Sequence, residues 1–239
     1  MTAASPEVSR AAAIADSKRL LRRSRTAALA TLGGDGAPLA TWVGCASDLD
    51  GSPLFLLSTL AQHTKDLAGD ARGSLLLTSA SDRGDPLNHP RLTVGGSIRP
   101  HPDPYALKRY LQRNPKARLY ASFSDFAIYR MAVERMHFNG GFGRADKLAP
   151  ADILICGDAA ALVAAEDALL AEINGGDGGL AARLAGHDAG RRAWRAVGLD
   201  PEGADLAAGG ATARVDFPSP GFDPDAWRKR LAEALAARE

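Results

Sequence analysis

Short apolar segments separated by glycine-containing turns recur early in the chain, and they constrain its fold more than any other feature. Residues 26–32 lead into a Gly-Gly-Asp-Gly turn at residues 33–36, and a second apolar segment occupies residues 38–46. An Asp-Gly turn at residues 50–51 then precedes the apolar run 53–58. Segments of this length, punctuated in this way, predict a meander of antiparallel β-strands.

The rest of the first 150 residues predicts more strands and a few helices. The further strands are 73–80, 89–99 and 127–138, and the helices are 7–25, 60–70 and 102–113. Strict alternation along the last strand places Met131 and Met136 on opposite sides. Six antiparallel strands with helical inserts predict a closed or nearly closed barrel, because closure removes exposed strand edges.

The composition changes after the glycine-rich residues 140–143, which divides the chain into predicted domains 1–150 and 151–239. Alanine-rich residues 159–184 predict two helices, because the glycines at 175–179 interrupt them at a cost of about 1 kcal/mol each. Residues 194–217 predict a small hairpin. A closing helix over 223–238 begins with Asp223 as its cap. The predicted class is therefore α+β, a six-stranded barrel followed by a small α+β domain.

Charge and composition exclude several classes of protein. The 239 residues carry 29 Lys+Arg and 28 Asp+Glu, a formal net charge of +1, which argues against general nucleic-acid binding. The sequence has no apolar run of about 18 residues and does not begin like a secretory signal, so we expect a cytoplasmic protein without a membrane span. Cys45 and Cys156 are the only cysteines, and we expect both as reduced thiols.

No motif for metal binding or nucleophilic catalysis is apparent. The five histidines are far apart in sequence and no two share a helix face, so no metal site is predicted. The sequence has no Gly-x-Ser-x-Gly elbow, and Cys45 lies within an apolar strand. Catalytic residues therefore stay unassigned.

The segment from residue 55 to residue 67 has the strongest chemical signal. A buried strand ends in the hydroxyls of Ser58 and Thr59, and a helix begins directly with His63, Thr64 and Lys65. Hydroxyls, free N–H groups at a helix start and a cation together suit a phosphate group. The alternative is an ordinary capped helix start followed by solvated charges.

Several motifs also carry a family resemblance. In order, ALATL at 28–32, DG-x-P at 35–38, STLA-x-HT at 58–64 and SLL at 74–76 resemble the FMN-binding split barrels related to pyridoxamine 5′-phosphate oxidase. Three later motifs narrow the resemblance to the haem-utilisation (HugZ-type) branch: PRLTV-x-G at 90–96, Y-x-x-F-x-DF at 120–126 and GGFGRA at 140–145. Residues 198–206 and 214–217 resemble the small domain fused to such barrels.

This resemblance implies a homodimer that holds FMN in each of two interface clefts and acts as an oxidoreductase on a small-molecule substrate. Thr41 and Val43 would approach the flavin ring, and Arg91 falls where related oxidases use a polar residue of the neighbouring subunit. The residues that would face the FMN phosphate are Ser58, Thr59, His63, Thr64 and Lys65.

The chain departs from the family pattern in two places. Asp66 replaces the usual Asn, and a like charge about 4 Å from a phosphate costs about 4 kcal/mol at an effective dielectric constant near 20. The small domain usually carries a His-Met-Asn-x-Asp-His pattern, but residues 172–177 read Glu-Ile-Asn-Gly-Gly-Asp. Both histidines are missing, which removes the expected haem ligand.

Three hypotheses follow from these observations. The first is an FMN-binding oxidoreductase. The second is a haem-binding or haem-degrading protein, in which Arg144 or Arg91 pairs with the propionates and His137 or His187 ligates the iron. The third is a binding or regulatory module without a cofactor.

Overall fold

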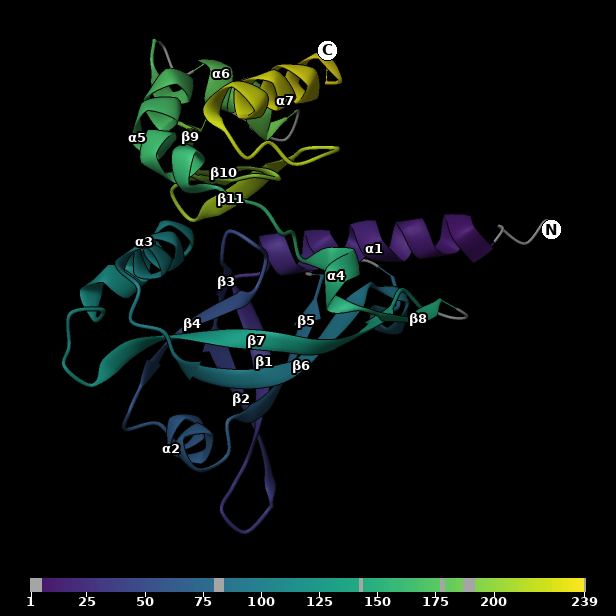
Figure 1. Cartoon of the computed structure of the whole chain (residues 1–239), viewed down its shortest axis with the longest axis vertical. Helices are drawn as coiled ribbons and strands as arrows, with labels where there is room; N and C mark the ends of the chain where they lie inside the picture. The colour runs from purple at the N-terminus through teal and green to yellow at the C-terminus, as the bar shows by residue number, and fades with distance from the viewer. Residues whose placement is uncertain (1–5, 80–83, 142–143, 177–178, 187–191, 239) are drawn as a thin grey trace. The chain divides into compact units, whose positions relative to one another are not determined.

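The computed structural model describes residues 6–79, 84–141, 144–176, 179–186 and 192–238 (Figure 1). The chain separates into two compact units, Met1–Ile155 and Cys156–Glu239, whereas the sequence prediction places the division after residue 150. The first unit is a curled antiparallel sheet with helices, and the second has its own small sheet and helices, so the predicted α+β class is confirmed. Within the described ranges, no helix is both long enough and apolar enough to cross a membrane.

The larger sheet contains eight strands rather than the predicted six. Their order is β2-β1-β5-β6-β7-β4-β3, and β8 pairs with β7. The predicted strand 38–46 is interrupted at Cys45, and β8 follows the last predicted strand. The predicted meander is confirmed only in part at its third strand, because β4 pairs antiparallel with β3, at the end of the predicted strand 38–46, but forms its longer ladder with β7. The strands are β1 (Thr26–Leu32), β2 (Pro38–Gly44), β3 (Ala46–Ser47), β4 (Pro53–Ser58), β5 (Arg72–Thr78), β6 (Arg91–Pro100), β7 (Phe126–Asn139) and β8 (Ala145–Leu148).

Two helices cover different parts of this sheet. Leu20 and Leu21 of α1 belong to the core formed by the inner-facing residues of the strands, such as Val94 and Phe138. Ala106 and Tyr110 of α3 pack in a separate cluster with Leu54 of β4. Leu67 of α2 packs into the same core as Leu20 and Leu21 of α1. The helical segments are α1 (Pro6–Arg23), α2 (Gln62–Gly69), α3 (Pro104–Arg113) and α4 (Pro150–Ile153), with 3-10 turns η1 (Pro86–Asn88) and η2 (Pro115–Leu119).

A β-bulge in β7 changes which side chains face the core. Gly95 pairs with Arg135 but Gly96 pairs with Val133, so Glu134 is an extra residue in β7. An extra residue reverses the alternation beyond it. Met131, before the bulge, and Met136, after it, therefore lie in the same core, which corrects the prediction that they face opposite sides.

The second unit folds around a three-stranded antiparallel sheet, where a two-stranded hairpin was predicted. The order is β11-β10-β9, with β9 (Arg195–Asp200), β10 (Gly203–Ala208) and β11 (Ala211–Asp216). The helices are α5 (Ala160–Asn174), α6 (Gly179–Ala185) and α7 (Pro224–Ala236). The predicted break between α5 and α6 is confirmed, and so is the cap of α7, where the Asp223 carboxylate accepts hydrogen bonds from the backbone N–H groups of Asp225 and Ala226.

Candidate functional site

The predicted phosphate segment forms the connection from β4 to α2. The helix begins at Gln62 after Ala61, whose carbonyl accepts hydrogen bonds from the N–H groups of Thr64 (3.1 Å) and Lys65 (3.2 Å). No side chain caps this helix start. The alternative prediction, an ordinary helix start capped by a side-chain hydroxyl, is therefore wrong about the cap.

The hydroxyl of Ser58 is hydrogen-bonded to Asp125, which directly precedes β7. It donates to Oδ2 of Asp125 at 2.5 Å and accepts from the N–H of Leu60 at 3.1 Å. The N–H of Thr59 donates to the carbonyl of Asp125 at 2.7 Å. A carboxylate thus sits where the sequence pattern places an anion, which weakens the case for a phosphate at Ser58.

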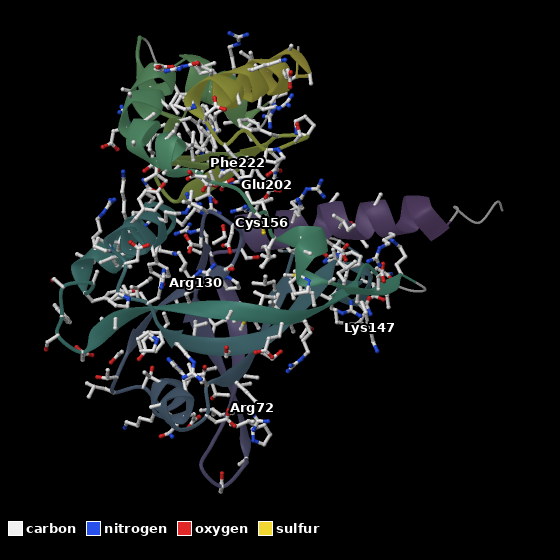
Figure 2. The ribbon with its side chains drawn as sticks, in the orientation of Figure 1. Arg72, Arg130, Lys147, Cys156, Glu202 and Phe222 are labelled. Atoms are coloured by element: carbon white, nitrogen blue, oxygen red, sulfur yellow. The ribbon has the colours of Figure 1, made fainter. Side chains whose placement is uncertain are left out.

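Thr64 and Lys65 are the members of the segment best suited to an anion. Thr64 is buried, and its Oγ1 has no hydrogen-bond partner among the described residues. Lys65 is exposed and lines a cavity of about 630 Å³ together with Gln62 and Arg72, the last of which Figure 2 shows beside α2. The Thr64 hydroxyl is a buried donor that a phosphate would satisfy, but Thr64 is not among the residues that line the cavity beside Lys65.

The charges around this cavity cancel. Asp66 and Asp70 also line it, and Asp70 pairs with Arg72 at 2.5 Å. The Asp66 carboxylate accepts hydrogen bonds from Oγ1 of Thr31 (2.9 Å) and Nε2 of Gln62 (2.8 Å). Asp66 therefore tethers α2 to β1, and its negative charge adds no attraction for an anion.

His63 lies on a different side of α2 from Lys65. Two helical positions correspond to a rotation of about 200°. Partial burial lowers the pKa of His63, and the nearby Asp66 carboxylate opposes that shift. An imidazole with a lowered pKa is mostly uncharged at neutral pH, so His63 adds little to phosphate attraction.

The remaining predicted residues lie elsewhere on the sheet. Thr41 and Val43 point toward the inner side of β2, where Val43 is part of the buried core and Thr41 reaches the carbonyl of Leu29 at 3.5 Å. Only the backbone of Val43 is therefore available to a ligand. Arg91 is half-buried at the start of β6, and its guanidinium donates to the carbonyls of Leu87 (2.7 Å) and His89 (3.5 Å).

The structure gathers a second group of residues on the side of the sheet that faces away from α1. Cross-strand pairing places one side chain from each of six strands in a row, which we call the outer row. Its members, in spatial order, are Trp42, Ala28, Leu76, Thr93, His137 and Lys147. Neighbours in such a row lie about 4.5–5.5 Å apart at Cβ.

The outer row has an apolar half, and its other half, which we call the cationic half after Lys147 and the nearby Arg135, contains Thr93, His137 and Lys147. Trp42 is 70% exposed and Leu76 is 39% exposed, with small Ala28 between them. At the other end, His137 and Lys147 are exposed neighbours, and Figure 2 shows Lys147 at the β8 end of the sheet. Arg135 lies two residues from His137, and its side chain crosses Gly95, where a Cβ would be 2.7 Å from Nε.

The sequence indicated part of this group. Alternation places Arg135 and His137 on one side of the β7 strand, and His137 is one of the two histidines considered for iron. Lys147 was missed because β8 was not predicted. Of the other haem candidates, Arg144 pairs with Asp16 at 3.5 Å, and His187 lies outside the described residues. The described residues contain no group of three or more His, Cys, Asp or Glu that is arranged to hold a metal ion by itself.

Known proteins with similar sequences and structures are consistent with this fold. The chloroplast non-canonical heme oxygenase of Arabidopsis thaliana is 32% identical over 114 residues, which are 46% of this chain and 34% of that protein. The match thus spans about a third of the relative's length. A protein of unknown function from Agrobacterium tumefaciens superposes with a TM-score of 0.78 and 35% identity, covering 98% of both chains.

A heme binding protein from Mycobacterium smegmatis superposes with a TM-score of 0.56 and 25% identity, covering 95% of this chain and 97% of that one. The family model of pyridoxamine 5′-phosphate oxidase matches residues 15–140, which is more than half of the chain. The chain therefore belongs to the pyridoxamine 5′-phosphate oxidase family and is similar to its haem-utilisation branch.

Proposed function

We propose that the protein binds haem against the cationic half of the outer row, with His137 as the iron ligand. The observation that carries this proposal is the position of His137, an exposed imidazole whose cross-strand neighbours in the outer row are Thr93 and Lys147. A neutral imidazole is a common axial ligand of haem iron. Lys147 and Arg135 supply positive charge for the two propionates.

The neighbouring residues suit the rest of a porphyrin. Thr93 of β6 is small, the Arg135 side chain lies across Gly95 beside it, and Leu76 of β5 extends the surface with an apolar side chain. Leu76 is two strands from His137, about 10 Å away at the usual strand spacing. When bound, haem would supply iron for oxygen and electron chemistry, and these residues would orient the ring and hold its charged edge.

The names of two relatives support the same ligand. One is a heme oxygenase and another is a heme binding protein. In this proposal, His137 of β7 supplies the imidazole in place of the two histidines that the small domain lacks.

The apolar half of the outer row supports a homodimer. Trp42 and Leu76 are exposed, and Ala28, Ala30 and Ala40 around them leave a flat sheet surface. Exposed apolar patches on a sheet face are typical of protein interfaces. A second copy that packs its own apolar half here would bring further surface close to the cationic half, where the haem would be enclosed.

FMN binding is the second candidate, and the buried, unpartnered Oγ1 of Thr64 favours it. Thr64 and Lys65 would hold the phosphate, and bound flavin would supply the redox chemistry of an oxidoreductase acting on a small substrate. Replacing Lys65 with Ala then weakens FMN retention. The Ser58–Asp125 hydrogen bond and the cancelled charges near Asp66 make this site less favourable than the cationic half of the outer row.

Haem titration of matched variants tests the proposal. The wild-type protein should develop a Soret band that saturates near one haem per chain. His137→Ala should weaken binding by about tenfold or more and shift the band, because the iron loses its ligand. His101→Ala is the control, since His101 is half-exposed beside Asp103, at 3.7 Å, before α3. Equal affinities and identical spectra for the wild type and His137→Ala would contradict the assignment.

A further inference from the structure

A second cavity opens where β1 and β5 separate. The ladder between these strands ends at the pair Ala28–Leu76, although both strands continue for two residues, to Thr26 and Thr78. A cavity of about 560 Å³ lies between these diverging ends and the last turns of α1. This volume is within the range of about 300–1,000 Å³ that is typical of small-molecule sites.

Three arginines line this cavity, which we call the arginine pocket. They are Arg19 and Arg23 from α1 and Arg25 from the connection to β1. The one carboxylate in the lining, Asp16, already pairs with Arg19 at 2.6 Å. The lining therefore has an excess of positive charge, unlike the cavity beside α2, where the charges cancel.

The arginine pocket also offers hydrogen bonds and an apolar wall. The side chains of Thr26 and Thr78 contribute hydroxyls, and Leu20 and Pro90 contribute apolar surface. Nε of Arg25 is buried and has no hydrogen-bond partner among the described residues. A buried donor without a partner is uncommon in folded proteins, and the charge of this guanidinium adds to the attraction of the pocket for an anion.

We infer that the arginine pocket binds a small organic anion, with its carboxylate or phosphate held by Arg25 and its neighbours and its apolar part against Leu20 and Pro90. Arginine suits both groups, because its planar guanidinium presents paired donors to oxygen anions. This site is separate from the proposed haem site, since it uses none of His137, Arg135 or Lys147.

Isothermal titration with three probes of similar size tests this inference. Benzoate and phenyl phosphate carry the two candidate anionic groups, and benzyl alcohol carries none. We expect both anions, or the one that fits, to bind the wild-type protein, and benzyl alcohol to bind at least about tenfold more weakly because it forms no charged hydrogen bond. An absence of binding by both anions, or equal binding of benzyl alcohol, would overturn the inference.

Matched variants locate the binding. Arg25→Gln should weaken the anion about tenfold, and Arg19→Gln, on an exposed side chain of the same lining, should weaken it by a smaller factor. Arg118→Gln removes an exposed arginine from η2, outside the lining of the pocket, and should leave affinity unchanged. A loss in Arg118→Gln equal to that in Arg25→Gln would indicate non-specific attraction and reject the site. His137→Ala should retain anion binding, so failure of the haem proposal is distinguishable from failure of this one.

Discussion

At the scale of single residues, the two cysteines occupy opposite environments. Cys45 is buried in the core between β2 and β3, and desolvation raises the pKa of its thiol to about 12, although Arg113 opposes the shift. Cys156 is exposed at the start of the second unit. Because the thiolate is the reactive form, Cys45 is protected both by burial and by its protonation.

Alkylation with iodoacetamide at about pH 8 should therefore modify one thiol per folded chain. Intact-mass spectrometry would count the adducts, and peptide mapping should place the adduct on Cys156. The control variant Cys156→Ser should take up none until it is unfolded in denaturant, and then one. Rapid addition of a second group to the folded wild type would show that Cys45 is accessible.

Single residues also explain why the segment 55–67 is less suited to bind phosphate than its sequence predicts. Ser58, Thr64 and Lys65 are close in sequence, so their grouping was readable from spacing alone. The partner of Ser58 is Asp125, 67 positions away, and only the pairing of β4 with β7 brings the two together. Long-range hydrogen bonds of this kind leave no local signal in one sequence.

At the scale of secondary-structure elements, the bulge in β7 depends on a close approach between β6 and β7. A Cβ at Gly96 would lie 2.0 Å from the backbone carbonyl oxygen of Ala132, a distance that no side chain can occupy without movement of the strands. Because the bulge brings Met131 and Met136 into one core, such movement would disturb both sides of the bulge.

Gly96→Ala should lower the free energy of unfolding of the larger unit by about 1–3 kcal/mol or more, the range for overpacking. Urea unfolding followed by circular dichroism measures the change. Gly34→Ala is the matched control, because nothing lies within 4 Å of its Cβ position and its backbone is not in the left-handed region. Equal stability of Gly96→Ala and the wild type would mean that β6 and β7 are farther apart at Gly96 than the structure shows.

The sequence predicted the positions of the strands and helices better than it predicted which strands pair. Turn signals and apolar runs located β1, β4 and β6 within a few residues, and the proline at 224 with Asp223 located the start of α7. Strict alternation failed in β7 because a bulge adds a residue without any distinctive composition. The short β8 was missed for a similar reason, since its four residues carry no apolar run.

At the scale of the whole molecule, the proposed homodimer rests on the apolar half of the outer row. Trp42 is 70% exposed on β2, at the edge of the larger sheet, and exposure of so large an aromatic ring to water is unfavourable. Packing against a second copy would remove Trp42, Leu76 and the intervening alanines from water.

Light scattering coupled to size exclusion should give the wild type a mass near twice its chain mass of 25.0 kDa. Trp42→Glu should shift the protein to monomer, because it places a charge in the apolar surface. Leu119→Glu is the control, since Leu119 is 79% exposed on η2, away from the outer row. A monomeric wild type, or a dimer that tolerates Trp42→Glu, would contradict this interface.

The most direct test of the central claim, that haem rather than flavin is the ligand, is one absorption spectrum recorded in three steps. The purified protein is measured alone, after incubation with excess FMN and desalting, and after the same treatment with haem. We predict a Soret band retained near one haem per chain and no retained flavin bands. Flavin retained near one per chain without a Soret band would contradict the haem proposal and favour the site at Thr64 and Lys65. A spectrum without either ligand would also contradict it, and would favour a binding module that uses no cofactor.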